Sequence, residues 1–89
     1  MRIATLKEIE KALEKELESA QKNLATAREH FRHWDLELDN ATNDEEIDTQ
    51  ELESIRENYG YYKERKEYWL DKAQEIRSAL EDFQMQDWR

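Results

Sequence analysis

The chain has 89 residues, of which 42% are charged and 37% hydrophobic, and its formal net charge is -9. This length allows one domain with a small core, and a composition with one Gly and no Pro is typical of long helices or coiled coils rather than sheets. The absence of cysteine excludes disulfides and thiolate metal sites. Without a signal-peptide pattern or a run of about 20 apolar residues, we expect a cytoplasmic protein that does not enter a membrane. Its negative charge also argues against direct binding of nucleic acid.

The first predicted helix covers about residues 6–38. Its apolar residues recur at alternating steps of three and four, which is the spacing of a coiled-coil seam. Thr5 and Glu8 fit a capping box, which predicts that the helix begins at Leu6. One polar residue, Glu10, interrupts this first seam. The seam positions are Ile3, Leu6, Glu10, Leu13, Leu17, Ala20, Leu24, Ala27, Phe31, Trp34 and Leu38.

An acidic turn is predicted over residues 39–47, because the Asn, Asp and Thr side chains of this stretch compete with helical hydrogen bonds. Asp48 and Glu51 fit a second capping box, and Ile47 with Leu52 fits a hydrophobic staple. The second helix should therefore begin next to this cap. A link this short makes the two helices antiparallel neighbours.

The second predicted helix covers about residues 49–87 and repeats the seam spacing. Lys66 is the one polar residue in this series. We expect its stem to lie over a small residue such as Ala20, with its ammonium group in water. The seam positions are Leu52, Ile55, Tyr59, Tyr62, Lys66, Trp69, Ala73, Ile76, Leu80 and Phe83.

Together the two seams predict an all-α fold, an antiparallel two-helix coiled-coil hairpin that forms a single domain over residues 1–89. If Leu38 ends the first helix level with Asp48, then Phe31 faces Ile55. A second register, shifted by one heptad, keeps both seams in contact but needs the first helix to run into the Asn/Thr stretch.

A single hairpin of this kind is marginally stable, because the entropy lost in ordering about 75 helical residues offsets most of the free energy of burial. Several apolar residues also lie outside both seams. We therefore expect a homodimer that forms a four-helix bundle and covers some of them. These residues are Ile9, Leu36, Tyr61, Tyr68, Leu70, Met85 and Trp88.

The net charge is concentrated in the middle of the chain. Residues 35–58 carry ten acids and a single base, Arg56, whereas the segments on either side are nearly neutral. We call this segment the acidic tip, because the hairpin places it at one end. Its charge predicts attraction to a basic surface on a partner protein. The candidate partner-binding residues are Asp39, Asp44, Glu45, Glu46, Asp48, Glu51 and Glu53.

In charge character the chain is similar to small acidic helical proteins of phages and mobile elements that block restriction or CRISPR enzymes. This resemblance of composition implies an inhibitor that mimics DNA and occupies a basic nucleic-acid-binding surface. The charge density at the tip approaches that of duplex DNA, about one charge per 1.7 Å. The alternative is that the tip only keeps a helical rod soluble and separated from its copies.

A second candidate surface is the tyrosine stripe, formed by Tyr61, Arg65, Tyr68 and Lys72 at spacings of four, three and four residues. These positions share one side of the second helix, away from its seam. Tyr and Arg are typical of interface hot spots, so the stripe is a candidate partner or dimer interface. Alternatively, the tyrosines only stack on neighbouring basic side chains. Gly60 adjoins the stripe and costs about 1 kcal/mol relative to Ala, which close approach by a partner would explain.

No motif in the sequence predicts catalysis. There is no glycine-rich phosphate loop and no nucleophile paired with a base and an orienting residue, so we expect neither enzyme activity nor a cofactor. His30, His33 and Glu37 share one surface but lack a further strong ligand, so they predict no metal site. The segment from Asp39 also lacks the glycine and the final acid of a calcium-binding EF-hand loop.

The leading hypothesis is therefore a non-enzymatic protein that binds a basic partner protein through its acidic tip. The alternative is a structural or assembly coiled coil that works through self-association of its helices. In that case the tip serves only to solvate the rod.

Overall fold

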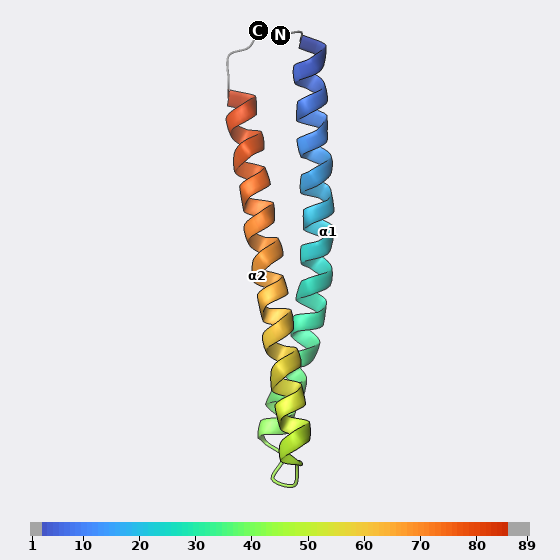
Figure 1. Ribbon diagram of the computed structural model, residues 1–89, viewed down its shortest axis with the longest axis vertical. Coiled ribbons are helices and arrows are strands. Elements are labelled where there is room, and N and C mark those ends of the chain that lie inside the picture. Colours follow the sequence, from blue (N-terminus) through green and yellow to red (C-terminus); the bar gives the residue numbers. More distant parts are fainter. Residues whose placement is uncertain (1–2, 86–89) are drawn as a thin grey trace.

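Two long helices form an antiparallel hairpin. The computed structural model describes residues 3–85, in which α1 (Ile3–Thr42) and α2 (Thr49–Met85) lie side by side and are joined by one tight turn (Figure 1). The Cα atoms extend over 67 × 15 × 14 Å, so the molecule is a rod with the turn at one end. The prediction of an all-α helical hairpin is confirmed, and the described residues contain no strand. Neither helix, within residues 3–85, contains a stretch apolar enough to cross a bilayer.

The contact between the helices follows the two predicted seams. Every seam position from Leu6 to Leu38 and from Leu52 to Phe83 is buried or half-buried, including the polar Glu10 and Lys66. Yet no large side chain is fully buried among the described residues, and four of the six buried apolar residues are alanines. These six are Ala20, Leu24, Ala27, Ala41, Ile55 and Ala73. The core is therefore a narrow strip in which small residues allow the helices to approach.

The first helix is longer than predicted at both ends. It begins at Ile3, so Thr5 lies inside the helix and is not its cap. It ends at Thr42 rather than near residue 38, because Ala41 continues the seam and is buried. The Thr42 hydroxyl also donates a hydrogen bond of 2.7 Å to the carbonyl oxygen of Leu38, which satisfies an acceptor in the last turn.

The turn-side end of α2 lies at the expected residue. The side-chain oxygen Oδ1 of Asp48 accepts a hydrogen bond of 3.4 Å from the Gln50 amide, and its carbonyl oxygen accepts one of 3.0 Å from the Leu52 amide. Asp48 is therefore the N-cap of α2. Ile47 and Leu52 are both half-buried, as a hydrophobic staple requires. At its other end α2 is described as far as Met85, and the expected end at residue 87 lies outside the described residues, as does Trp88.

The register is the second of the two that the sequence allows, shifted by one heptad from the first. Phe31 lies between Tyr59, with ring centroids 5.2 Å apart, and Lys66, whereas the first register places it opposite Ile55. Tyr62 likewise meets both His30 and Trp34. The shift follows from the extension of α1 to Thr42, which moves the turn further along the chain.

Aromatic rings cluster across the seam in the half of the hairpin nearer the turn. Trp34 stacks on Tyr62 with an interplanar angle of 5°, and the His30 ring meets the same tyrosine edge-on at 5.0 Å. Lys66 Nζ lies 4.1 Å from the centroid of Phe31. The ammonium group of half-buried Lys66 therefore lies over Phe31, a contact that the sequence did not predict, because the shifted register brings this aromatic face within its reach.

Gly60 offers a direct test of the packing around α2. A Cβ added at Gly60 would meet no atom within 4 Å, so nothing within the described hairpin requires a glycine there. Gly60→Ala should therefore raise the free energy of unfolding by about 0.5–1 kcal/mol, because alanine loses less backbone entropy in a helix. Urea denaturation followed by circular dichroism at one fixed protein concentration measures this change.

The matched control is Ala25→Gly, at an exposed position inside α1, which should lower the free energy of unfolding by a similar amount. If Gly60→Ala destabilised the hairpin instead, the helix around residue 60 would have to be packed more closely than described.

Candidate functional site

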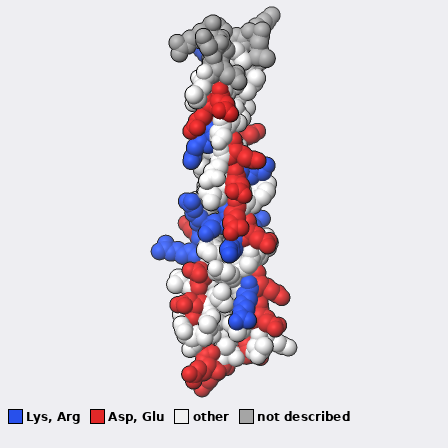
Figure 2. All heavy atoms as spheres, turned by 90° about the vertical axis from the view of Figure 1, so that its left-hand side faces the viewer, with Lys and Arg blue, Asp and Glu red and all other residues white. Residues whose placement is uncertain are grey.

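The acidic tip comprises the turn and the adjoining ends of both helices. All ten of its acidic side chains are exposed. Figure 2 shows acidic side chains gathered at the lower end of the rod, where the turn lies in Figure 1, while acidic and basic side chains are mixed along the stalk. Since a helix rises 1.5 Å per residue, these charges occupy only about the last 15 Å of the hairpin. The tip is therefore a compact, densely charged end.

Asp44 orders the turn from within. Its side-chain oxygen Oδ1 accepts a hydrogen bond of 3.0 Å from the amide of Glu46, which is the geometry of an Asx turn. Its carbonyl oxygen accepts a bond of 3.4 Å from the Ile47 amide, and its own amide donates to the carbonyl oxygen of Ala41 at 3.2 Å. Two acids of the tip, Asp44 and Asp48, thus also define the path of the backbone.

The acids of the tip point to several sides of the hairpin. Successive helical residues are about 100° apart, so Asp35 and Asp39 share one side of α1 while Glu37 points nearly the opposite way. On α2, Glu53 and Glu57 share a side that Glu51 does not. Because the tip is charged on all sides, a cleft that surrounds it can pair with more of its acids than a flat surface can.

No base within the described residues forms a salt bridge with the acids of the tip. The two ion pairs of residues 3–85 both lie on the stalk, between Glu18 and Lys22 at 3.5 Å and between Lys72 and Glu75 at 3.8 Å. The last turn of α1 contains Asp39 and no basic residue, although the C-terminal end of a helix carries partial negative charge. The charges of the tip therefore repel one another and the α1 terminus.

The tyrosine stripe runs along the middle of α2 and faces outward as predicted. Tyr61 is 54% and Tyr68 is 53% exposed. A basic group lies near each ring: the Arg65 guanidinium is 5.8 Å from the centroid of Tyr61, and Lys72 Nζ is 5.9 Å from the centroid of Tyr68. These distances allow weak cation–π contacts, but they leave much of both rings uncovered.

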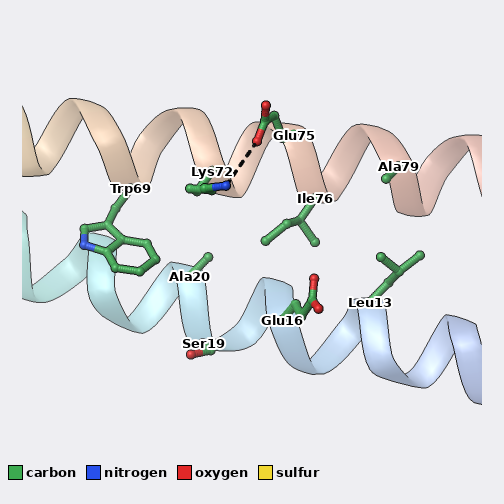
Figure 3. A pocket seen from close by; sticks show the side chains of 9 residues that line it. All are labelled: Leu13, Glu16, Ser19, Ala20, Trp69, Lys72, Glu75, Ile76 and Ala79. Carbon is green, nitrogen blue, oxygen red and sulfur yellow. Dashed lines mark ion pairs between the residues drawn. The ribbon is translucent and has the colours of Figure 1, made fainter.

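Beside the stripe, an open groove of about 460 Å³ lies between the two helices (Figure 3). Its apolar surface comes from Leu13, Ala20, Trp69, Ile76 and Ala79, and its rim carries Glu16, Ser19, Lys72 and Glu75. Lys72 belongs to both the stripe and the groove, so the two adjoin on one side of the hairpin. We call this combined surface the groove face.

A second, smaller hollow continues the groove face toward the turn. It is lined by Tyr61, Arg65 and, from α1, Asn23, Thr26 and His30, together with Ala27 and Tyr62 of the seam. The sequence predicts the stripe but neither hollow. Their only sequence signal is a row of mostly small or uncharged residues on α1, and this row can be interpreted only when the register is known.

The histidines of α1 are engaged with aromatic rings. His30 meets Tyr62, and His33 contacts Trp34 with centroids 5.1 Å apart. No group of three or more His, Cys, Asp or Glu side chains within residues 3–85 is arranged to hold a metal ion. The tip thus offers exposed charge, and the groove face offers exposed aromatic and apolar surface.

Comparison with known proteins does not assign the chain to a family. No protein-family model, curated protein or solved structure matches it. A function must therefore be inferred from the geometry and charge of these two surfaces.

The repulsion at the tip predicts a stabilising substitution. Asp39→Asn should raise the free energy of unfolding by about 0.3–1 kcal/mol at low salt, because it removes a negative charge from the C-terminal turn of α1. Denaturation at low salt and at about 1 M NaCl, where the Debye length is about 3 Å, measures the effect. The gain should largely vanish at high salt. Glu29→Gln, an exposed change in mid-helix, is the control and should alter stability little; an equal gain there would contradict the dipole explanation.

The role of Asp44 in the turn predicts a difference between two substitutions. Asp44→Ala removes the acceptor of the Glu46 amide and should lower the free energy of unfolding by about 0.5–1.5 kcal/mol. Asp44→Asn removes the same charge but keeps a side-chain oxygen that can accept this bond, so it should leave stability unchanged or slightly raised. Thermal unfolding of the two variants compares them directly, and equal melting temperatures would show that this hydrogen bond contributes nothing.

Proposed function

We propose that the chain is a non-enzymatic binding protein that inserts its acidic tip into a basic cleft of a partner protein. The observation that carries the proposal is the set of ten exposed acids around a narrow hairpin end, without a salt bridge to any base of the described residues. Such charges retain their full capacity to pair with Lys and Arg of another protein.

The placement of the charge favours binding over solubility alone. A rod is kept in solution by charges dispersed over its surface, and the stalk already carries a mixed set of acids and bases. Concentrating the net charge at the end of α1 opposes its helix dipole and costs stability. Local arrangements that cost stability are expected where a protein binds or reacts.

Nucleic-acid-binding sites are the kind of cleft that best fits this tip. Their Lys and Arg side chains are arranged to neutralise closely spaced phosphates. About nine net charges within roughly 15 Å of hairpin length match the line density of duplex DNA, about one charge per 1.7 Å. We therefore propose that the tip inhibits a nucleic-acid-binding protein by occupying its cleft, in the manner of a DNA mimic.

The test is capture of partner proteins from a cell lysate on the immobilised chain, followed by competition with duplex DNA for each captured protein. The tip variant combines Asp44→Asn, Glu45→Gln, Glu46→Gln, Asp48→Asn and Glu51→Gln. Asparagine at positions 44 and 48 preserves acceptors for the Asx turn and the helix cap. If each lost contact is worth about 0.3–1 kcal/mol, the affinity should fall at least tenfold.

The matched control neutralises five exposed acids of the stalk and therefore changes the net charge equally: Glu14, Glu29, Glu64, Glu67 and Glu81, each replaced by Gln. The control should retain its partner, and capture by the wild-type chain should weaken as salt is raised. If both variants lost capture of the partner equally, net charge and not the position of the charges at the tip would explain the binding. Unchanged capture by the tip variant would remove the tip from the mechanism, and a captured protein that still binds DNA would refute inhibition.

The exposed tyrosines favour a second candidate function, assembly through self-association. Among the described residues no large side chain is fully buried, and Tyr61 and Tyr68 are about half exposed, so the hairpin has an uncovered surface suited to another helix pair. In this case the tip variant above would associate as the wild type does, while loss of the tyrosines would abolish assembly.

A further inference from the structure

We propose that the groove face is a dimer interface, on which two copies pack antiparallel so that their acidic tips lie at opposite ends of the particle. This surface is separate from the tip, and the proposal does not depend on the tip having a partner.

The first support is the amount of exposed surface. The hairpin exposes 7220 Å² of accessible surface. A compact monomer of its mass, 10.9 kDa, exposes about 5,600 Å². The difference of roughly 1,600 Å² exceeds the about 800 Å² that each partner buries in a standard-size interface. Each copy could therefore bury a standard-size interface on its groove face and still expose at least as much surface as a compact monomer of its mass.

The second support is that the groove face complements itself. When two antiparallel copies of α2 cross about a two-fold axis, residues equally distant from the crossing point oppose each other. With the crossing at the level of Leu70, Arg65 opposes Glu75 of the second copy, so opposite charges meet. Tyr68 opposes Lys72, which permits a cation–π contact between copies.

The same crossing places the exposed ring of Tyr61 opposite Ala79, at the groove beside Ile76 (Figure 3). A protruding ring thus meets a hollow lined by small and apolar side chains. Apart from Glu16 at the rim, the α1 residues that line the two hollows are small or uncharged, so they allow the second copy to approach. They include Ser19, Asn23 and Thr26.

The third support is the charge of the tips, which selects the orientation. In a parallel dimer the two tips would lie side by side at a helix packing distance of about 8–10 Å, close to the Debye length of about 8 Å at physiological salt. Ten acids on each copy would then repel one another with little screening. The antiparallel arrangement separates the tips by most of the length of the 67 Å rod.

The pairing of Arg65 with Glu75 gives a test by charge exchange. Sedimentation equilibrium of the wild-type chain should give twice the mass of 10.9 kDa. Arg65→Glu should weaken dimerisation at least tenfold, and adding Glu75→Arg to it should restore most of the affinity, because the opposed charges are again complementary. Lys63→Glu, the same charge change on the other flank of α2, is the control and should leave the dimer intact.

Two further variants test packing and orientation. Tyr61→Ala combined with Tyr68→Ala should yield a helical monomer, because both rings are exposed within one hairpin and their loss leaves the seam unchanged. Since the chain has no cysteine, Asp44→Cys introduces a single thiol at the tip. A short bis-maleimide should not cross-link this variant between the two copies of a dimer.

Four results would overturn the proposal. A wild-type chain that is monomeric at about 100 µM, or a dimer that survives loss of both tyrosines, would show that the groove face is not an interface. Failure of the double charge exchange to restore affinity would refute the proposed crossing. Efficient cross-linking at position 44 would show that the copies lie parallel.

Discussion

The structure depends on a single line of contact between two helices. A helix in a hairpin can bury only the stripe that faces its partner, so every large side chain in the seam keeps one edge in water. This explains why alanines make up most of the buried residues and why Phe31 and Trp34 are only half-buried. It also explains why so much of the hairpin is free for other contacts: most described residues outside the seam are exposed, and any further function must use those outer faces or the turn.

The turn determines how the two seams align, and the same turn carries the charge. Because the apolar pattern of the seam repeats every seven residues, the helices can be shifted by one heptad without losing their apolar contact. The seam alone therefore does not determine the register. The choice is made where α1 ends and Asp44 and Asp48 accept the backbone hydrogen bonds of the turn. These two residues therefore link stability to electrostatics: each supplies a side-chain oxygen that accepts a backbone hydrogen bond, and each also exposes a negative charge at the tip.

The sequence predicts those features that depend on local pattern. The seam positions follow from spacing, and the start of α2 follows from Asp48, because a cap is a local interaction. The end of α1 does not follow, since the Asn, Asp and Thr residues after Leu38 disfavour a helix by propensity, yet burial of Ala41 against α2 overrides them. The groove face and the contact of Lys66 with Phe31 could not be predicted either, because both depend on which turns of the two helices stand opposite each other.

The two proposed surfaces reinforce each other through the charge of the tip. A tip that attracts a basic cleft also repels its own copy, so the charge proposed for binding would also prevent the groove faces from pairing in parallel. The proposed antiparallel pair would carry one acidic tip at each end. If a partner presents two clefts at a matching separation, the second tip binds intramolecularly, and the avidity can exceed that of one tip by about 10²–10⁴. Moderate affinity at each tip, as expected for exposed charge pairs, would then suffice for firm inhibition.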